Sequence, residues 1–429
     1  MNRFAVERTL KAVVILVIAS AVFSTGCDLL NVSNPNSLVE EDLNTPEGAS
    51  ALKNGLLNAL MEGTGWAYAP LSSGSDELRW DGSYESYRDF QVGSFSDPSN
   101  EITNNTWPIL TEARWLADDA IDRISAFEEE EGGIEDPTIL TKTYIYSALT
   151  RITIADTYED FVYSDQRDAG SPIGSGNMDR LYKEAISNLD KAVSRAQSNG
   201  NTTLEMQALG VRARAKHARA VWEKLNPPGS IPSDPLVSQS LRSSGAVDDA
   251  EAALELMPAD YEAQFDYLGP QIANYLSGQV NGRNELDFFD PPADPKTGEP
   301  DPRIENAIAE FTNTDEFAED FAPITWISSR EMRLIIAEAD IGNDDAEARQ
   351  ELNELRAMND LPPIEAGDDL VEYLEHERRA NLFLQGRRLL DMYRFGTESP
   401  TWLDGTQAKQ SPGSVLPIPS SERQTNPNL

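Results

Sequence analysis

The stretch DRLYKEAISNLDKAVSRAQ, residues 179–197, shows the pattern that decides the fold class. Its apolar and small side chains recur at every third or fourth position, as Leu181, Ala185, Ile186, Leu189, Ala192, Val193 and Ala196. This period places them on one face of an α-helix and leaves the charged side chains on the other. The stretch therefore predicts an amphipathic helix that packs against neighbouring helices along one stripe.

Similar periodicity predicts long helices on both sides of this stretch. We expect a first helix after Thr45-Pro46-Glu47 and others over about 105–128, 138–160, 203–225, 328–341, 345–358 and 369–394. Small residues recur where such helices would cross, for example Ala113, Ala148 and Ala192. Paired antiparallel helices of this kind are typical of tetratricopeptide-like stacking. The predicted fold is all-α, a tetratricopeptide-like helical-repeat scaffold with irregular, loop-rich insertions at about 63–104 and 226–325.

The first thirty residues are typical of an exported lipoprotein. Arg3, Arg8 and Lys11 precede an apolar run of about 12 residues, the length of a secretory signal and too short for a membrane span. The run ends at Ser24-Thr25-Gly26-Cys27, which resembles a lipobox, although Ser24 stands where leucine is commonest. We expect removal of the signal peptide 1–26, lipidation of Cys27, an N-terminal tether over 27–45 and a helical domain over 46–429.

Cysteine usage and charge limit the partners. Cys27 is the single cysteine among 429 residues, so no disulfide can form within the chain. With 73 acidic and 35 basic residues the net charge is −38, which repels nucleic acid and anionic lipid. An acidic, lysine-poor surface is typical of a halophilic protein, and a polycationic partner is the alternative explanation.

Several stretches, in this order, resemble the SusD/RagB family of outer-membrane nutrient-binding lipoproteins. They are Cys27 to Gly55, Ser75-Asp76-Glu77, Trp107 with Ala113-Arg114 and Ala117-Asp118, Asp301-Pro302-Arg303, Glu331 to Ala339, Leu352 to Ala357, Glu377-Arg378-Arg379, Gln385 to Arg388, Asp391, Arg394, and the ending Leu416 to Leu429. Asn381 and Gln385 depart from the family, whose members usually carry glutamates there. We interpret Glu377, Arg378, Arg387 and Arg388 as structural charge pairs on one helix.

The resemblance implies a function, a partner and a location. Members bind glycans or peptides through elements outside the helical repeats. They act in nutrient uptake with a SusC-type TonB-dependent outer-membrane transporter. The resemblance thus implies a lipid-anchored protein of the outer membrane that faces the cell exterior and binds an oligosaccharide or a peptide.

Signals for catalysis are poor. The two histidines, His217 and His376, lie far apart in the sequence and have no cysteine partner for a zinc site. No G-x-S-x-G, P-loop or G-x-G-x-x-G motif occurs. We predict a protein that is not an enzyme. Two alternatives remain, a lipid-anchored helical-repeat scaffold that binds proteins or peptides, and a glycan-processing enzyme that uses a pair of carboxylates.

The aromatic residues of the first insertion are the candidate ligand site. Sugar rings stack their apolar face on Trp and Tyr, while Asp and Arg bond their hydroxyls. The candidate residues are Trp66, Tyr68, Arg79, Trp80, Asp81 and Tyr84. Trp80 and Tyr84 are spaced like neighbours on one helical face, and Trp66 and Tyr68 are expected a loop away. The alternative is that these rings only pack the insertion onto the helices.

A second candidate is the acidic loop 281–303. Its carboxylates Asp287, Asp290, Asp294 and Asp301 are of the type that Ca²⁺ prefers, although no EF-hand spacing is present. We interpret the segment as an acidic solvated loop and assign neither a metal nor another cofactor, with Ca²⁺ as the alternative.

Overall fold

The computed structural model describes residues 40–130, 132–165, 168–267, 272–312 and 321–429. Cys27, the signal segment and most of the predicted tether lie outside these ranges. The chain divides into two compact units, and the first ends at Gly48. Its described part holds a helical turn, α2 (Glu40–Leu43), and a 3-10 turn, η2 (Pro46–Gly48). In the described part of the chain, no helix combines the length and apolarity needed to cross a membrane.

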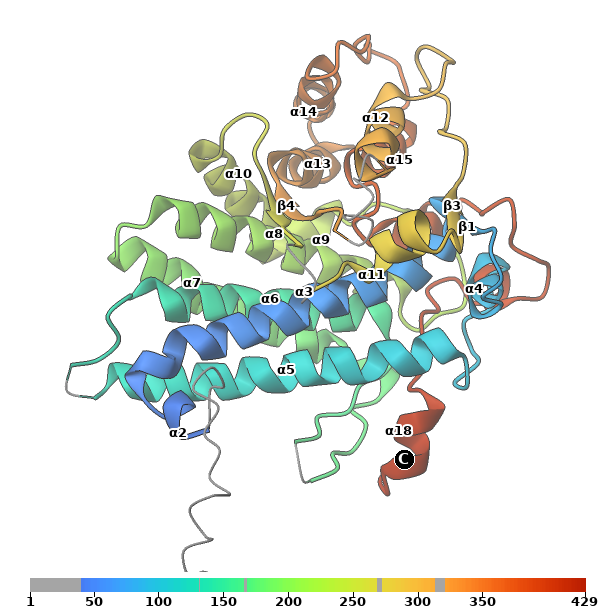
Figure 1. The fold of residues 1–429 in the computed structure, drawn as a ribbon. Coiled ribbons are helices and arrows are strands. Elements are labelled where there is room, and N and C mark those ends of the chain that lie inside the picture. The colour runs from blue at the N-terminus through green and yellow to red at the C-terminus, as the bar shows by residue number, and fades with distance from the viewer. Residues whose placement is uncertain (1–39, 131, 166–167, 268–271, 313–320) are drawn as a thin grey trace, which may run out of the picture. The chain divides into compact units, whose positions relative to one another are not determined.

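The second unit, residues 49–429, is built on long helices. They are α3 (Ala49–Ser73), α5 (Glu101–Glu128), α6 (Thr138–Thr157), α7 (Asp179–Ser198) and α8 (Thr202–Leu225). Helices adjacent in the chain pack side by side from α5 to α8, and α3 lies against α5 and α6 (Figure 1). On α7 the predicted stripe is buried, with Leu181, Ala185 and Leu189 fully enclosed, except for Ile186, which is half-buried. The prediction of an all-α fold is confirmed.

Shorter helices complete the unit. They are α4 (Ser86–Gln91), α9 (Ser238–Ser244), α10 (Ala246–Leu256), α11 (Tyr275–Ser277), α12 (Pro302–Thr312), α13 (Ser329–Asp340), α14 (Asp345–Ala357), α15 (Leu370–Asn381), α16 (Arg388–Phe395), α17 (Gln407–Gln410) and α18 (Ser420–Thr425), with a 3-10 turn, η3 (Ser175–Asn177), and a π-turn, η4 (Gly278–Gly282). The α13–α14 pair packs on α15, and α10 joins it to α8. The second helical layer is thus attached to the first mainly through α10 and α13.

Two short antiparallel ribbons bring distant segments together. Strand β1 (Leu78–Trp80) pairs with β3 (Leu286–Phe288), with Arg79 opposite Asp287. Strand β2 (Glu262–Phe265) pairs with β4 (Ile324–Ser328) through a bulge at Ala263/Gln264. Both ribbons connect the second predicted insertion to other parts of the chain, and they frame the two surfaces described below.

The expectation of an irregular, loop-rich segment from residue 63 is wrong for its first eleven residues. Helix α3 continues to Ser73 through Gly63, Gly65 and Pro70, which all disfavour a helix in isolation. Tertiary contacts compensate. Gly63 permits close packing, because a Cβ there would lie 2.7 Å from Leu110 Cδ2 of α5. Pro70 leaves the Trp66 carbonyl without its usual donor, and the Thr106 hydroxyl lies 3.5 Å from that oxygen.

The single helix expected over 369–394 is also wrong. It is divided into α15 and α16 at residues 382–387, where Leu384 (φ 56°) and Gly386 (φ 76°) have left-handed backbone conformations. A right-handed helix cannot pass through such residues. Consequently Glu377 and Arg378 lie on α15, Arg387 and Arg388 lie at the start of α16, and their ion pairs run to other elements.

Candidate functional site

A stacked pair of rings forms the centre of the aromatic surface. Trp66 of α3 faces Tyr275 of α11 with ring centroids 3.4 Å apart and planes inclined by 13°. The residue before Trp66 is Gly65, and a Cβ there would lie 2.8 Å from the Tyr275 backbone nitrogen. Both rings are half-buried. The glycine therefore lets α11 approach α3 closely enough for the rings to stack.

The loop that carries Tyr84 is held in place by Glu285. The Glu285 carboxylate accepts hydrogen bonds from the backbone N–H groups of Ser83 and Tyr84, each at 2.7 Å, and its backbone oxygen accepts one from Asp81 at 3.1 Å. Tyr84 is half-buried, and burial raises the pKa of its hydroxyl, helped by a hydrogen bond to Glu101 and by nearby Tyr275. Tyr84 thus stays a neutral hydroxyl beside the stacked pair.

Arg79, Trp80 and Asp81 lie at the end of β1 and just after it. Arg79 forms an ion pair with Asp287 of β3 at 2.5 Å, and both side chains remain more than two-fifths exposed. Asp81 is exposed, whereas the Trp80 ring is half-buried. The indole N–H of Trp80 is buried and has no hydrogen-bond partner among the described residues. Trp80 and Tyr84 do not share a helical face, because Trp80 is in a strand and Tyr84 in a loop.

Tyr68 belongs to the core and not to this surface. Its side chain is 4 % exposed, and its hydroxyl oxygen lies 3.3 Å from both Arg214 Nη2 and Arg387 Nη1. The expected position in a loop is corrected, since Tyr68 is on α3, two residues after Trp66 and so on roughly the opposite face of the helix. The prediction for Tyr68 failed because the extent of α3 was not visible in the sequence. The aromatic surface is hereafter Trp66, Tyr84 and Tyr275, and Trp80 lies four residues before Tyr84 at the end of β1.

Sequence reasoning missed Tyr275, and with it Arg283. Tyr275 lies in the second aromatic-rich insertion, 209 positions after Trp66, and only the fold brings the two rings together. Arg283 is exposed and electrostatically lowers the pKa of Tyr84 and Tyr275, opposing burial. The surface therefore offers ring faces beside one guanidinium and the carboxylates of Glu101 and Asp81, a combination that suits a hydroxyl-rich ligand.

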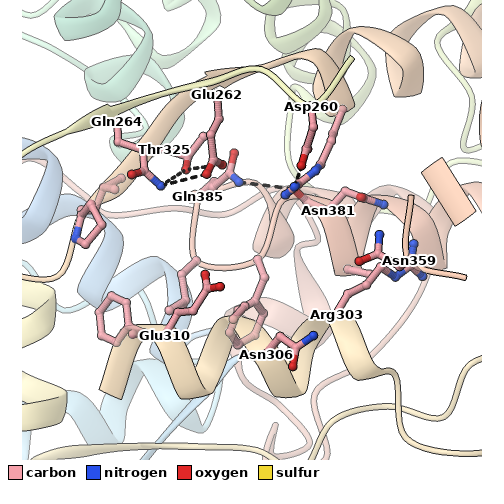
Figure 2. A pocket seen from close by; sticks show the side chains of 18 residues that line it. Asp260, Glu262, Gln264, Arg303, Asn306, Glu310, Thr325, Asn359, Asn381 and Gln385 are labelled. Atoms are coloured by element: carbon pink, nitrogen blue, oxygen red, sulfur yellow. Dashed lines mark hydrogen bonds and ion pairs between the residues drawn. The ribbon is translucent and has the colours of Figure 1, made fainter. Parts of the chain in front are cut away.

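A polar pocket of about 400 Å³ lies elsewhere, between the β2–β4 ribbon, α12 and the segment after α15 (Figure 2). Glu262 and Thr325 come from the ribbon, Asn306 and Glu310 from α12, and Gln385 from the turn after α15. Glu262 accepts hydrogen bonds from Gln264 and Thr325, each at 3.2 Å. The lining residues of this pocket come from five separate segments of the chain, so the sequence alone does not reveal it.

Behind the pocket lies a buried ionic network, which accounts for the acidic residues proposed as Ca²⁺ ligands. Arg356 donates to both carboxylate oxygens of Asp294, at 2.7 and 3.1 Å, and Arg303 to both of Asp301, at 3.0 and 2.7 Å. His376 Nε2 lies 2.8 Å from Asp301. Burial would raise the pKa of Asp301, but His376 and Arg303 more than offset it and hold that pKa well below its usual range.

The four predicted Ca²⁺ ligands are not brought together as one site. Asp294, Asp301 and His376 converge, yet guanidinium groups already occupy the positions where a cation would bind. Asp287 pairs with Arg79, and Asp290 is exposed. The interpretation as a solvated loop is also corrected for Asp294 and Asp301, since both side chains are fully buried. A continuous acidic sequence does not reveal which carboxylates will face an arginine from another helix.

Residues 329–414, which span α13 to α17, match the sequence model of the SusD family. This part of the chain is therefore similar to the SusD family. The match and the fold confirm the resemblance found in the sequence. No curated protein matches the SusD-like chain in sequence.

Solved structures of the same fold cover nearly the whole chain. A SusD homolog from Bacteroides thetaiotaomicron aligns with a TM-score of 0.65 at 14 % identity, over 91 % of this chain and 98 % of its own. A SusD-like carbohydrate-binding protein from Bacteroides vulgatus gives 0.62 at 15 % identity, over 90 % and 97 %. A laminarin-binding SusD-like protein gives 0.52 at 14 % identity, over 90 % and 100 %. At these identities the alignments establish the fold.

Proposed function

We propose that this SusD-like chain is a cell-surface glycan-binding lipoprotein, anchored to the outer membrane through Cys27. The observation that carries the proposal is the aromatic surface, where Trp66 and Tyr275 stack and Tyr84 lies beside them. Such rings bind the apolar faces of sugars. Two proteins of the same fold are described as carbohydrate-binding and laminarin-binding, which supports the ligand class.

The proposal includes a role in uptake with a SusC-type TonB-dependent transporter. Binding would be non-covalent, and the transporter would move the ligand across the outer membrane. The resemblance to SusD/RagB proteins and the lipobox at Cys27 support this part. Co-purification of such a transporter with the full-length protein from detergent-solubilised membranes is the expected result, and Cys27→Ser should release the protein from the membrane fraction.

Glycan binding is tested directly by calorimetry with a panel of oligosaccharides that includes laminarin fragments. Wild type should bind at least one of them, and Trp66→Ala, Tyr84→Ala and Tyr275→Ala should each weaken that binding. Trp222→Ala is the matched control, because Trp222 is a half-buried ring that lines a different cavity. Unchanged affinity in all three variants would move the glycan site to another surface. Chromatography of the incubated ligand tests the enzymatic alternative, since a binding protein returns the oligosaccharide intact.

A further inference from the structure

The polar pocket between β2–β4, α12 and the turn after α15 contains a buried acceptor without a donor. Gln385 is 8 % exposed, and its Nε2 donates to the backbone oxygen of Asn381 at 3.3 Å. Its Oε1 is buried and has no hydrogen-bond partner among the described residues. A buried amide oxygen left unbonded is destabilising, because it has lost its hydrogen bonds to water. A donor from a ligand in the pocket would remove that cost.

The turn that presents Gln385 is held in a strained conformation. Leu384 has φ 56°, which is unfavourable for a side chain branched beyond Cβ, and its backbone N–H donates to the buried Glu77 carboxylate at 2.8 Å. The N–H of Gln385 donates to the Leu382 oxygen at 3.1 Å. Strained backbone of this kind is concentrated at functional sites. The position of the Gln385 amide is thus fixed by contacts that lie outside the pocket.

The charges on the pocket wall favour a cation. Both arginines that line it are already paired, Arg303 with Asp301 and Glu377, and Arg330 with Asp260. Glu262 and Glu310 form no ion pair with any described residue. Figure 2 shows Glu262 and Gln385 on one side of the pocket and Glu310 on the other. Acceptors therefore face the cavity from both sides, and no uncommitted cation balances them.

A bare metal ion does not fit these acceptors. Among the described residues, the only group of three or more His, Cys, Asp or Glu side chains close enough to ligate one ion is the Asp294 group behind the pocket. The pocket carboxylates are spread around a space of about 400 Å³, which is large enough for a small organic molecule. Such a ligand can place several N–H and O–H donors at separated acceptors.

We infer that this pocket binds a small organic cation with a protonated primary amine and further hydroxyl donors, of the amino-sugar class. The ammonium group would lie between Glu262 and Glu310, and a hydroxyl or ammonium hydrogen would bond Gln385 Oε1. Both carboxylates are exposed, so each ion pair is worth a few-fold in affinity, and the two together give about tenfold over a neutral analogue. The pocket does not include the aromatic surface, so it is a second site.

D-Glucosamine is the probe, titrated calorimetrically into the mature protein at about pH 6, where its amine is protonated. D-Glucose and N-acetyl-D-glucosamine are the neutral comparisons. We expect glucosamine to bind about tenfold more tightly than either, and to weaken as sodium chloride is raised because salt screens the carboxylates. Equal binding of the three sugars, or no detectable binding of glucosamine, would overturn the inference.

Three variants locate the site. Glu262→Gln and Glu310→Gln should each weaken glucosamine binding a few-fold, because each removes half of the uncompensated charge. Gln385→Met should also weaken it, since it keeps the length of the side chain but removes the acceptor. Glu305→Gln is the matched control, an exposed carboxylate on α12 that does not line the pocket. Thermal unfolding of each variant establishes that it is folded.

The test of glucosamine binding in this pocket can be distinguished from the test of oligosaccharide binding at the aromatic surface. Trp66→Ala should leave glucosamine affinity unchanged, and Glu310→Gln should leave oligosaccharide affinity unchanged. If Glu262→Gln and Glu310→Gln bind glucosamine like wild type, or if Trp66→Ala abolishes its binding, the cation site is not in this pocket.

Discussion

Arg394 donates to both carboxylate oxygens of Glu338, at 2.5 and 3.1 Å, and neither side chain is exposed to solvent. The carboxylate also accepts from the Val237 N–H at 3.0 Å and contacts His217 Nε2 at 2.9 Å. Burial alone would raise the pKa of Glu338, but Arg394 and then His217 outweigh burial and hold that pKa well below its usual range. Helices α8, α13 and α16 thus meet at one ionised carboxylate.

Glu338→Gln should destabilise the protein severely. The substitution leaves the buried Arg394 guanidinium with only Asp391 of its two carboxylate partners, and breaking a buried pair typically costs about 3–5 kcal/mol. The free energy of unfolding from urea titration measures the loss. Lys183→Met is the control, because it removes an exposed helical pair with Asp179 that is worth about 0–1 kcal/mol. Equal losses in the two variants would contradict the structural role of the Glu338 pair.

A second buried carboxylate, Glu77, should make the folded state less stable as pH rises. Glu77 is enclosed, and burial raises its pKa to about 7, although hydrogen bonds from the Leu384 N–H and the Ser72 hydroxyl oppose the shift. Between about pH 4.5 and pH 7, Glu77 is therefore protonated in the folded state and ionised in the unfolded chain, where its pKa is near the ordinary 4.5. This contribution to stability is full below about pH 4.5 and falls as pH rises to about 7, by roughly 3 kcal/mol.

Glu77→Gln isolates that contribution, because its amide cannot ionise. Unfolding free energies of wild type and variant are compared from about pH 5 to about pH 8, with Glu305→Gln as an exposed control. The stability of Glu77→Gln relative to wild type should increase up to about pH 7 and level off above it. Parallel pH profiles for the two proteins would show that Glu77 stays ionised in the fold.

Gly386→Ala should cost more than an ordinary glycine substitution. Gly386 has φ 76°, and a Cβ there would lie 2.5 Å from Cε1 of the buried Tyr68 ring. Gly342 has φ 79° but nothing within 4 Å of the added atom. Gly342→Ala therefore measures the backbone term alone, about 1 kcal/mol, and Gly386→Ala should exceed it by about 1–3 kcal/mol for overpacking. Similar melting temperatures for the two variants would argue against this tight contact.

Trp80 of β1 and Tyr68 of the core should behave differently. Trp80→Ala should weaken glycan binding by about 1–3 kcal/mol, the effect of losing an aromatic anchor. Tyr68→Phe should leave glycan affinity unchanged and lower stability by about 1 kcal/mol, because its hydroxyl bonds two buried arginines. Calorimetry and urea unfolding on the same samples separate the two effects. A loss of affinity in Tyr68→Phe would return Tyr68 to the ligand site.

The sequence predicts the fold where one helix carries one continuous stripe, as α7 does. It fails where tertiary contacts override local preference. Gly63 and Pro70 disfavour a helix, and only the packing of α3 on α5 and α6 keeps it intact to Ser73. Leu384 carries no sign of its left-handed backbone, which depends on a hydrogen bond to a residue 307 positions earlier.

The candidate site also combines residues that the sequence predicts with residues that only tertiary contacts bring together. Trp66, Trp80 and Tyr84 could be named because sugar-binding chemistry favours aromatic residues near Asp and Arg. Tyr275 could not be assigned to them, since its position opposite Trp66 is decided by the close approach of α11 at Gly65. The pocket of Figure 2 could not be predicted from the sequence either, because each segment of the chain contributes only a few of its lining residues.

The contact of the segment 74–77 with the C-terminal part of the chain has a kinetic consequence. Arg388 pairs with Asp76 across 312 positions, and the Trp402 indole N–H donates to the Gly74 oxygen across 328. Loop-closure entropy opposes such distant contacts, and proteins rich in them fold slowly. The segment after α3 therefore reaches its final contacts only when the last tenth of the chain has joined the fold. Until then Asp76 lacks the Arg388 guanidinium that neutralises it in the finished protein.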